Sequence, residues 1–279
     1  MSLNYKIAAF ADEASGELAG QIKAMKDNGV SMLEMRGVDG FNPVSITLDH
    51  CKEIRSQLEA NGLSVWSIGS PCGKDQIADD FTPQLDRMKH VIDVAVACGA
   101  SRIRMFSFHG CQDAAATRDE VLYRLTRFCE AAEGSGVKLC HENEKGIYGD
   151  NAERCNDILR NVPALGGIFD PANFLQCNQP TVEAWELLKD RIDYFHIKDV
   201  NAQGKIVPAG CGDGHIPELL KDYLKNGGQV MTLEPHLKIF DALKAIETGE
   251  KSQIENAYAS SEEAFAAAAN ALKKILAEI

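Results

Sequence analysis

Short apolar segments alternate with longer amphipathic segments along almost the whole chain. A short run of apolar residues predicts a buried strand, whereas apolar residues that recur every three or four positions predict a helix with one buried face. The apolar runs predict eight strands, at Tyr5–Phe10, Ser31–Arg36, Leu63–Gly69, Arg102–Ser107, Val137–Glu142, Leu165–Asp170, Ile192–Ile197 and Gln229–Glu234.

An amphipathic segment follows each predicted strand. Several of these segments begin at a residue that commonly caps a helix and end near glycine, which is typical of helix boundaries. Eight strand-helix units in succession favour an α/β protein with a single closed (β/α)8 barrel, a TIM barrel, over an open doubly wound sheet with fewer strands. The helices are predicted at Gly16–Asn28, Thr47–Asn61, Thr82–Cys98, Thr117–Gly134, Asn151–Asn161, Thr181–Asp190, Ile216–Asn226 and Ser260–Ile279.

No change of composition marks a domain boundary, so residues 1–279 are predicted to form a single TIM-barrel domain. An extended segment at 235–258 follows the last strand, and a short helix is predicted within it near Phe240–Glu247. The helix at 260–279 carries an apolar stripe, which predicts that it packs onto the barrel as the closing helix. A contact between subunits is the alternative.

Four consecutive predicted strands end in polar side chains, which are Glu142, Asp170, His196 and Glu234. The active site of an α/β barrel lies at the carboxyl ends of its strands. Side chains alternate between the two faces of a strand, so Phe195 takes the face toward the helices and His196 the face toward the barrel interior. The same parity turns all four polar side chains into the barrel mouth and directs His141 toward the helices.

Three carboxylates and one imidazole that converge suit one divalent metal ion, such as Mn²⁺, Mg²⁺, Co²⁺ or Zn²⁺. Without a cation, the inward carboxylates would repel one another and lose their hydration. The alternative is that each residue is an isolated polar group at the rim, satisfied by the backbone or by water. The matching orientation of four neighbouring strand ends favours the metal site.

Composition narrows the functional classes. The formal net charge of −12 and the pI near 5.1 argue against general binding to nucleic acid or to an anionic membrane. Nine cysteines without a paired spacing predict reduced thiols, and the N-terminus lacks the pattern of a signal peptide. We therefore expect a cytoplasmic protein without membrane or nucleic-acid partners, for which a homo-oligomer stays open.

The motifs ENEKGIYGD, FDPANF, HIKD and LEPH, in this order and spacing, resemble the xylose-isomerase-like barrel superfamily of sugar and sugar-phosphate isomerases, epimerases and abasic-site endonucleases. FADEAS, LEMR and SIGSPCGK extend the resemblance over almost the whole chain. In the ketose 3-epimerase branch, a glutamate, an aspartate, a histidine and a second glutamate hold one divalent metal. The resemblance implies that Glu142, Asp170, His196 and Glu234 hold it here.

The resemblance also implies the chemistry, which is that of a divalent-metal-dependent isomerase or epimerase of a small sugar or sugar phosphate. One of Glu142 and Glu234 would remove a proton next to a carbonyl, the metal would stabilise a cis-enediolate, and either glutamate would return a proton. Return to the same carbon from the opposite face gives epimerisation, and return to the neighbouring carbon gives isomerisation. Glu142 and Glu234 are therefore the predicted catalytic residues.

Three further residues near these strand ends are candidates for substrate binding. Asn173 stands where similar epimerases place a substrate-binding histidine, and capping of the following turn is the alternative. Lys198 points inward by parity, toward a substrate oxygen or phosphate, with an ion pair to Asp199 or another rim carboxylate as the alternative. Lys205 is the candidate for a basic residue that related epimerases place further along this loop.

Four other substrate-binding candidates lie at the predicted rim. His109 follows the fourth strand and is a candidate ligand or substrate contact, with a plain polar rim group as the alternative. Arg36 shares its parity with Glu34, and an internal pair between these two is the alternative to substrate contact. Glu144 and His236 stand two residues beyond the glutamates of the fifth and eighth strands and are expected to line the mouth.

The glycine-bearing segment GCGDGHIP after the seventh strand is expected to be a loop near the substrate. Its backbone amides, at the start of the next helix, are candidates for binding a phosphate. The segment does not match the GxGxxG pattern of a dinucleotide site, and SPCGK lacks the GxxxxGK[ST] pattern of a P-loop. Nucleotide binding by either motif is therefore disfavoured.

Three alternatives to the isomerase or epimerase stay open. A keto-inositol or sugar-acid dehydratase would use the same metal site and expel a hydroxyl from the enediolate. An abasic-site endonuclease is disfavoured because that enzyme type uses three metals and extra histidines, one of which is replaced by Asn173. A non-catalytic carbohydrate-binding barrel would hold metal and sugar without turnover.

Overall fold

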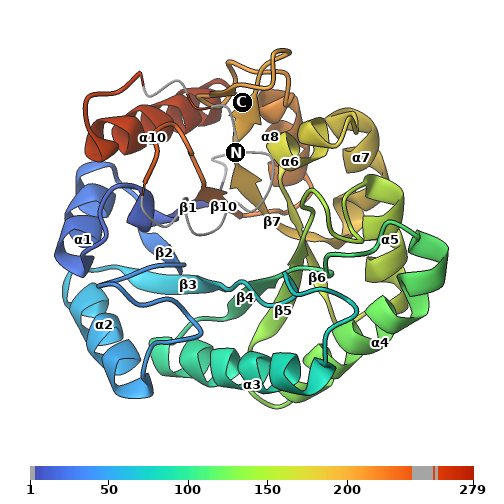
Figure 1. Ribbon diagram of the computed structural model, residues 1–279. Coiled ribbons are helices and arrows are strands. Elements are labelled where there is room, and N and C mark those ends of the chain that lie inside the picture. The colour runs from blue at the N-terminus through green and yellow to red at the C-terminus, as the bar shows by residue number, and fades with distance from the viewer. Residues whose placement is uncertain (1–3, 241–253, 255–256) are drawn as a thin grey trace.

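The computed structural model describes residues 4–240, 254 and 257–279. Parallel strands close into a barrel in the order β1-β10-β7-β6-β5-β4-β3-β2, and helices surround it (Figure 1). All eight predicted strands are confirmed, each within its predicted range, and with them the (β/α)8 fold. The strands are β1 Lys6–Ala9, β2 Met32–Met35, β3 Ser64–Gly69, β4 Arg102–Met105, β5 Lys138–Glu142, β6 Gly166–Phe169, β7 Ile192–Ile197 and β10 Val230–Leu233.

The predicted helices are also present, with differences at their ends. Helices α3 and α4 begin before the predicted Thr82 and Thr117 because Asp80 and Asp113 cap them. Their side chains accept hydrogen bonds from backbone amides of the first turn, at 3.0 and 3.1 Å. The helices are α1 Leu18–Asp27, α2 Leu48–Ala60, α3 Phe81–Cys98, α4 Ala114–Ala132, α5 Ala152–Asn161, α7 Thr181–Leu188, α8 Ile216–Lys225 and α10 Ser261–Glu278.

Several short elements lie at the strand ends and were not predicted. Asp170 caps the six-residue helix α6, whose first residue is Pro171, a residue well suited to that position. A small antiparallel pair of strands, β8 and β9, follows β7 in the loop toward α8. The bounds of the added elements are η1 Ala11–Glu13, α6 Pro171–Gln176, η2 Lys189–Arg191, β8 Asp199–Val200 and β9 Ile206–Val207.

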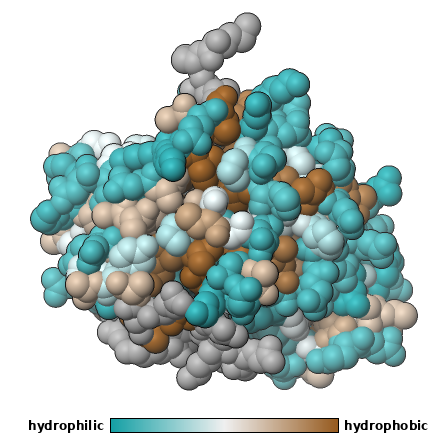
Figure 2. Space-filling view, turned by 90° about the horizontal axis from the view of Figure 1, so that it is seen from above, coloured by the Kyte–Doolittle hydropathy of each residue, from teal (hydrophilic) through white to brown (hydrophobic). Residues whose placement is uncertain are grey.

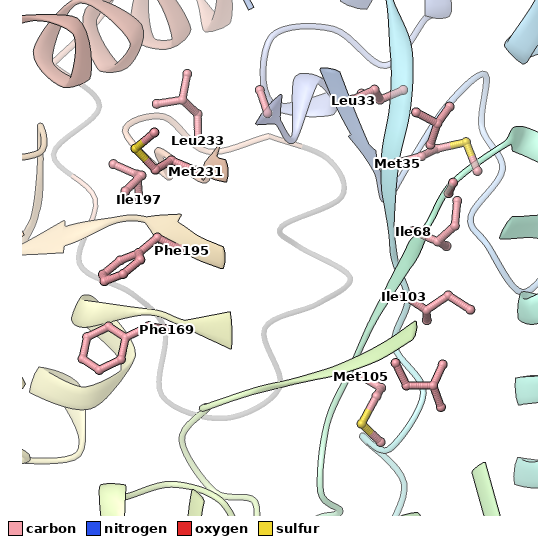
Figure 3. Packing of buried hydrophobic residues seen from close by; sticks show 14 of the residues in the cluster. Leu33, Met35, Ile68, Ile103, Met105, Phe169, Phe195, Ile197, Met231 and Leu233 are labelled. Atoms are coloured by element: carbon pink, nitrogen blue, oxygen red, sulfur yellow. The ribbon is translucent and has the colours of Figure 1, made fainter. Parts of the chain in front are cut away.

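The hydrophobic core has two layers, as the strand alternation predicts. Outward side chains such as Phe169 and Phe195 pack between the strands and the helices, where Figure 3 shows them side by side on neighbouring strands. Inward side chains such as Ile168, Tyr194 and Val230 form a second buried cluster inside the barrel. The predicted parity of β6 and β7 is therefore confirmed, which orients the polar residues at their ends.

The outer layer is expected to carry much of the stability. Phe169 is fully buried, and its ring centroid lies 5.0, 5.5 and 5.1 Å from those of Phe174, Trp185 and Phe195. We expect Phe169→Ala to lower the free energy of unfolding by about 3–5 kcal/mol, because it leaves a cavity among these rings. The midpoint of urea unfolding measures the effect, and Phe41→Ala, at a ring that is 43% exposed, is the control. Equal midpoints for the two variants would contradict the expectation.

The C-terminal helix α10 occupies the predicted position 260–279 and packs against α1 and η1. Phe265 and Leu272 of its apolar stripe are buried in the main core. The predicted segment 235–258 includes the helix predicted near Phe240–Glu247. Of that helix, Phe240 belongs to the described residues and the other residues lie outside them. The assignment of residues 1–279 to a single domain stays a prediction.

The surface mixes hydrophilic residues with small groups of hydrophobic ones on the face that Figure 2 shows. Among the described residues, no helix has the length and apolar character that crossing a membrane requires. All nine cysteines have free thiols, and Cys211 is the exposed one among them.

Candidate metal centre

The four polar residues predicted at consecutive strand ends meet inside the barrel mouth. Glu142 ends β5, Asp170 and Glu234 directly follow β6 and β10, and His196 lies in β7. One ligand atom from each residue lies within 4.8 Å of those of the other three, and all four residues are buried. We call Glu142, Asp170, His196 and Glu234 the four-ligand cluster.

The imidazole of His196 lies between carboxylates on both sides. Its Nδ1 is 2.9 Å from Glu142 Oε1 and 3.2 Å from Glu234 Oε2, whereas Nε2 is 3.3 Å from Glu34 Oε2. The edge of the ring meets Phe10, with the centroids 5.2 Å apart. Nδ1 is therefore the nitrogen that faces the other members of the four-ligand cluster.

The four-ligand cluster fits a divalent cation. Glu142 Oε2 and Asp170 Oδ2 are buried oxygens that form no well-aligned hydrogen bond with the described residues, and each faces a cation, Arg104 at 3.4 Å and Lys198 at 2.9 Å. Buried carboxylate oxygens are normally satisfied by a donor or by a metal, because their desolvation is costly. Three carboxylates with one imidazole nitrogen are a donor set that Mn²⁺, Mg²⁺, Co²⁺ and Zn²⁺ all accept.

The protonation equilibria of the cluster reflect its crowded negative charge. Burial raises the pKa of Asp170 to about 7, with Glu234 and Glu142 adding to the rise against the pull of Lys198. Burial alone would lower the pKa of His196, but Glu142 and Glu34 outweigh it and raise that pKa well above its usual value. The fold thus gathers carboxylates at a density that a positive charge must balance.

Lys198 lies beside the four-ligand cluster. Its Nζ is 2.9 Å from Asp170 Oδ2 and 3.4 Å from Glu234 Oε2. The inward orientation predicted for Lys198 is confirmed, and its partners are carboxylates of the cluster. Asp199, the first alternative partner considered, is engaged elsewhere. The attraction of Asp170, Glu234 and Glu142 outweighs burial and raises the pKa of Lys198, which keeps the ammonium charged.

Two arginines extend the buried charge network toward the open end of the barrel. Arg104 Nη1 lies 3.4 Å from Glu142 Oε2.

The expected internal pair between Arg36 and Glu34 is wrong, because Arg36 binds other groups. Its guanidinium donates two hydrogen bonds to Asp12 and one to Glu13, and its Nη1 donates to Glu234 Oε1 at 3.1 Å. Arg36 faces the mouth beyond the strand end, whereas Glu34 lies deeper in the interior.

Asn173 lies against the four-ligand cluster and does not cap the turn that follows. Its Nδ2 donates to the Asn143 carbonyl at 2.9 Å and to Glu142 Oε1 at 3.4 Å. The capping role belongs to Asp170, whose Oδ1 accepts from the backbone amide of Asn173. The alternative interpretation of Asn173 as a capping residue is therefore wrong, and its side chain orients a predicted catalytic glutamate.

A cavity of about 800 Å³ opens at the barrel mouth, and its lining includes Arg36, Lys74, Arg104 and His109. His109 lies apart from the four-ligand cluster, with its Nδ1 2.9 Å from the Gly146 carbonyl. His109 therefore lies at the rim, as its place after the fourth strand predicts, but the structure does not bring it to the four-ligand cluster.

The remaining rim candidates occupy different places. Glu144 lies 3.2 Å from Lys74. Burial would raise the pKa of Glu144, but the charges of Lys74 and Lys198 and a backbone hydrogen bond outweigh it and lower that pKa to about 2. His236 Nε2 lies 3.5 Å from both Glu13 and Glu234, so it borders the cluster. Lys205 lies in the turn between β8 and β9, where its backbone pairs with Asn201.

The loop that contains GCGDGHIP is organised by a carboxylate of the chain itself. Asp199 accepts hydrogen bonds from the backbone amides of Gly210, Gly212 and Gly214 at 2.9–3.1 Å, and from that of Val200 at 3.0 Å. A Cβ at Gly212 would lie 2.4 Å from Asp199 Oδ1, so the loop requires glycine there. Asp199 therefore already occupies three of the backbone amides that this segment was expected to offer to a phosphate.

Sequence reasoning missed several partners of the network. Asp12 and Glu13 follow β1 and hold Arg36, and Lys74 of SPCGK holds Glu144. The signal for Asp12 and Glu13 was their place directly after a barrel strand, where polar residues gather at the active-site end. Glu34 was noted only as a partner for Arg36, and its approach to His196 was not foreseen.

A family model described as xylose isomerase-like TIM barrel matches residues 22–275 of the chain. No curated protein matches the chain in sequence.

Solved structures with the same fold come from several enzymes. The chain is similar to a D-allulose 3-epimerase from Methylomonas sp. in complex with D-allulose, with 15% identity, 97% of both chains covered and a TM-score of 0.75. It is similar to the probable 3-DHS dehydratase AsbF from Bacillus anthracis, with 14% identity, 97% of this chain and 98% of that chain covered, and a TM-score of 0.73. A third similar structure is that of IOLI protein with a zinc atom, with 16% identity, 98% of both chains covered and a TM-score of 0.74.

Proposed function

The chain belongs to the xylose isomerase-like TIM barrel family, and on this premise we propose that it is a divalent-metal-dependent isomerase or epimerase of a small carbohydrate. The observation that carries the proposal is the four-ligand cluster, whose four residues are buried and whose donor atoms lie within 4.8 Å of one another. The proposed substrate is a sugar or sugar phosphate with a carbonyl next to a hydroxyl.

The ion would be held by carboxylate oxygens of Glu142, Asp170 and Glu234 and by Nδ1 of His196. When bound, a divalent ion polarises a substrate carbonyl and makes the adjoining C–H more acidic. Asp170 suits the role of ligand only, because it also caps α6 and faces Lys198.

The proposed proton transfers belong to Glu142 and Glu234. These residues come from β5 and the end of β10, which β6 and β7 separate in the barrel, so we expect them to approach a substrate from different sides. One carboxylate would remove the proton at the carbon next to the carbonyl, which requires an approach of about 3 Å between heavy atoms. Return of the proton from the other side inverts that carbon, and return to the neighbouring carbon exchanges aldose and ketose.

Substrate oxygens would be held by polar side chains around the cluster. Lys198 and Arg104 are charged donors that form ion pairs with carboxylates of the four-ligand cluster, and the Asn173 amide donates to Glu142. The same role is proposed for the rim residues Arg36, His109, Glu144, Lys205 and His236. A homo-oligomer and a cytoplasmic location stay predictions.

The test of the proposed function is a search for proton exchange. The protein, loaded with Mn²⁺ in D₂O, is incubated with a panel of ketoses, aldoses and keto-inositols, and the products are analysed by NMR. We expect one deuterium at the carbon next to the carbonyl, in a product that is an isomer of its substrate. Loss of water would instead identify a dehydratase, incision of abasic DNA an endonuclease, and absence of any turnover a binding protein.

A further inference from the structure

We propose that Glu34 is a positioning residue that keeps the proton of His196 on Nε2 and so presents the Nδ1 lone pair to the metal ion. This inference rests on the metal site of the proposed function and assigns a role to a residue outside the four-ligand cluster. Glu34 lies in β2, fully buried in the barrel interior, and Glu34 Oε2 is 3.3 Å from His196 Nε2.

The orientation of the Glu34 carboxylate is set by its other oxygen. Oε1 accepts a hydrogen bond from the Tyr194 hydroxyl at 2.9 Å and one from the Ser67 hydroxyl at 3.1 Å. The two hydroxyl oxygens also lie 3.1 Å apart, and because each has a single hydrogen, one of them can donate to the other in place of Oε1. With Oε1 engaged on this side, Oε2 is the oxygen that is left for the imidazole of His196.

The chemistry of the pair decides the tautomer. A carboxylate only accepts hydrogen bonds, so the nitrogen that faces Glu34 has to carry a proton. A neutral imidazole has a proton on one nitrogen, and the other nitrogen then has the lone pair that a metal needs. Both nitrogens of His196 face carboxylates, but those on the Nδ1 side, Glu142 and Glu234, are proposed ligands themselves, so a bound ion would replace the proton there. Glu34, on the Nε2 side, lies outside the four-ligand cluster and would keep its hydrogen bond. Partners of this kind fix the ring and strengthen a metal-ligating histidine as a donor.

The rest of the barrel holds the ring in the same orientation. Phe10 and Tyr194 meet the imidazole of His196 at centroid distances of 5.2 and 5.5 Å, both edge to face. His196 is fully buried, so no rotation of the ring is possible without moving these aromatic side chains. Glu34 therefore acts on a ring that packing has already placed, and its contribution is the choice of the protonated nitrogen.

The test compares metal affinity in matched variants, with Zn²⁺ as the probe and a chromophoric chelator as the competitor. Glu34→Gln keeps the shape of the side chain but removes the charge, and its amide can turn a donor toward Nε2. We expect the dissociation constant for Zn²⁺ to rise about 10–100-fold. Tyr194→Phe, which removes one donor to Oε1 and leaves the carboxylate, is expected to raise the constant by less.

Ser107→Ala is the matched control. It removes the partner of a second buried histidine, His141, whose Nε2 lies 2.9 Å from Ser107 Oγ on the outward face. We expect this variant to bind Zn²⁺ like the unmodified protein. A loss of affinity equal to that of Glu34→Gln would show a general effect on folding and overturn the proposal.

A spectroscopic readout separates positioning from mere stability. In the Zn²⁺-loaded unmodified protein, ¹⁵N NMR should show His196 with a proton on Nε2, and Glu34→Gln should shift this resonance. Unchanged affinity and an unchanged resonance in Glu34→Gln would overturn the role of Glu34, while the proposed function would stand if the unmodified protein bound Zn²⁺ and exchanged substrate protons. Failure of the unmodified protein to bind any divalent ion would overturn both.

Discussion

Replacing either Glu142 or Glu234 by glutamine is expected to lower the rate of proton exchange by about 10²–10⁴-fold, the usual effect of losing a general base. Glutamine keeps the size of the side chain and one oxygen, but it cannot take up a proton at neutral pH. Each substitution also removes one negative charge from the four-ligand cluster, where both carboxylates lie within hydrogen-bonding distance of His196.

The two variants should differ if each glutamate serves one side of the substrate. With a ketose that is epimerised, one variant is expected to incorporate deuterium from D₂O when the reaction starts from one epimer, and the other variant when it starts from the other epimer. Both rates should lie far below that of the unmodified protein. Metal content measured in parallel separates loss of a base from loss of the ion. Glu59→Gln, at an exposed side chain on α2, is the control. Full exchange in both buried variants would exclude the proposed mechanism.

Removal of the metal ion is expected to abolish proton exchange and to lower the thermal unfolding midpoint. An ion that binds only the folded state stabilises it by RT ln(1 + [ion]/Kd), which is about 4 kcal/mol when the free ion exceeds Kd 1,000-fold. The physical reason is that Glu142, Asp170 and Glu234 place three carboxylates in one buried site, where neighbouring charge and burial already raise the pKa of Asp170 to about 7. A chelator titration followed by calorimetry measures the effect, and added Mn²⁺ should restore both activity and midpoint.

Asp170→Asn is the matched variant for this experiment. Asparagine caps a helix as well as aspartate does, so α6 should keep its first turn while the cluster loses one charged ligand. We expect the unfolding midpoint of this variant to respond little to chelator or to Mn²⁺. A midpoint of the unmodified protein that ignores both additions would rule out a resident ion at the four-ligand cluster.

Local rules were enough to predict most of the fold and the four polar residues that meet in the four-ligand cluster. Strand positions follow from short apolar runs, and the alternation of Phe195 with His196 orients the strand end because successive side chains always point to opposite faces. Helix starts were less well predicted at α3 and α4, where Asp80 and Asp113 compete with nearby threonines as caps. The short elements α6, β8 and β9 were missed because so few residues carry no clear periodicity.

Partners across the barrel were the part that local rules could not reach. Arg36 was assigned to Glu34 because the two share a face of one strand, yet its partners come from η1 and from the end of β10. The carboxylate of Asp199 binds three of the backbone amides of GCGDGHIP, and this depends on how the loop folds back. Such pairings depend on barrel closure and loop path, which no local pattern encodes.

By itself, the sequence determined that this protein is a (β/α)8 barrel with Glu142, Asp170, His196 and Glu234 turned toward its mouth, because hydrophobic periodicity and strand parity are properties of neighbouring residues. Only the tertiary structure decided that the four share one site and that Lys198 forms ion pairs with two of them. It also decided that Glu34 contacts His196, which lies 162 positions away in the chain. Closure of the barrel brings strands distant in sequence to a single axis, and the side chains that meet there are chosen by geometry in three dimensions.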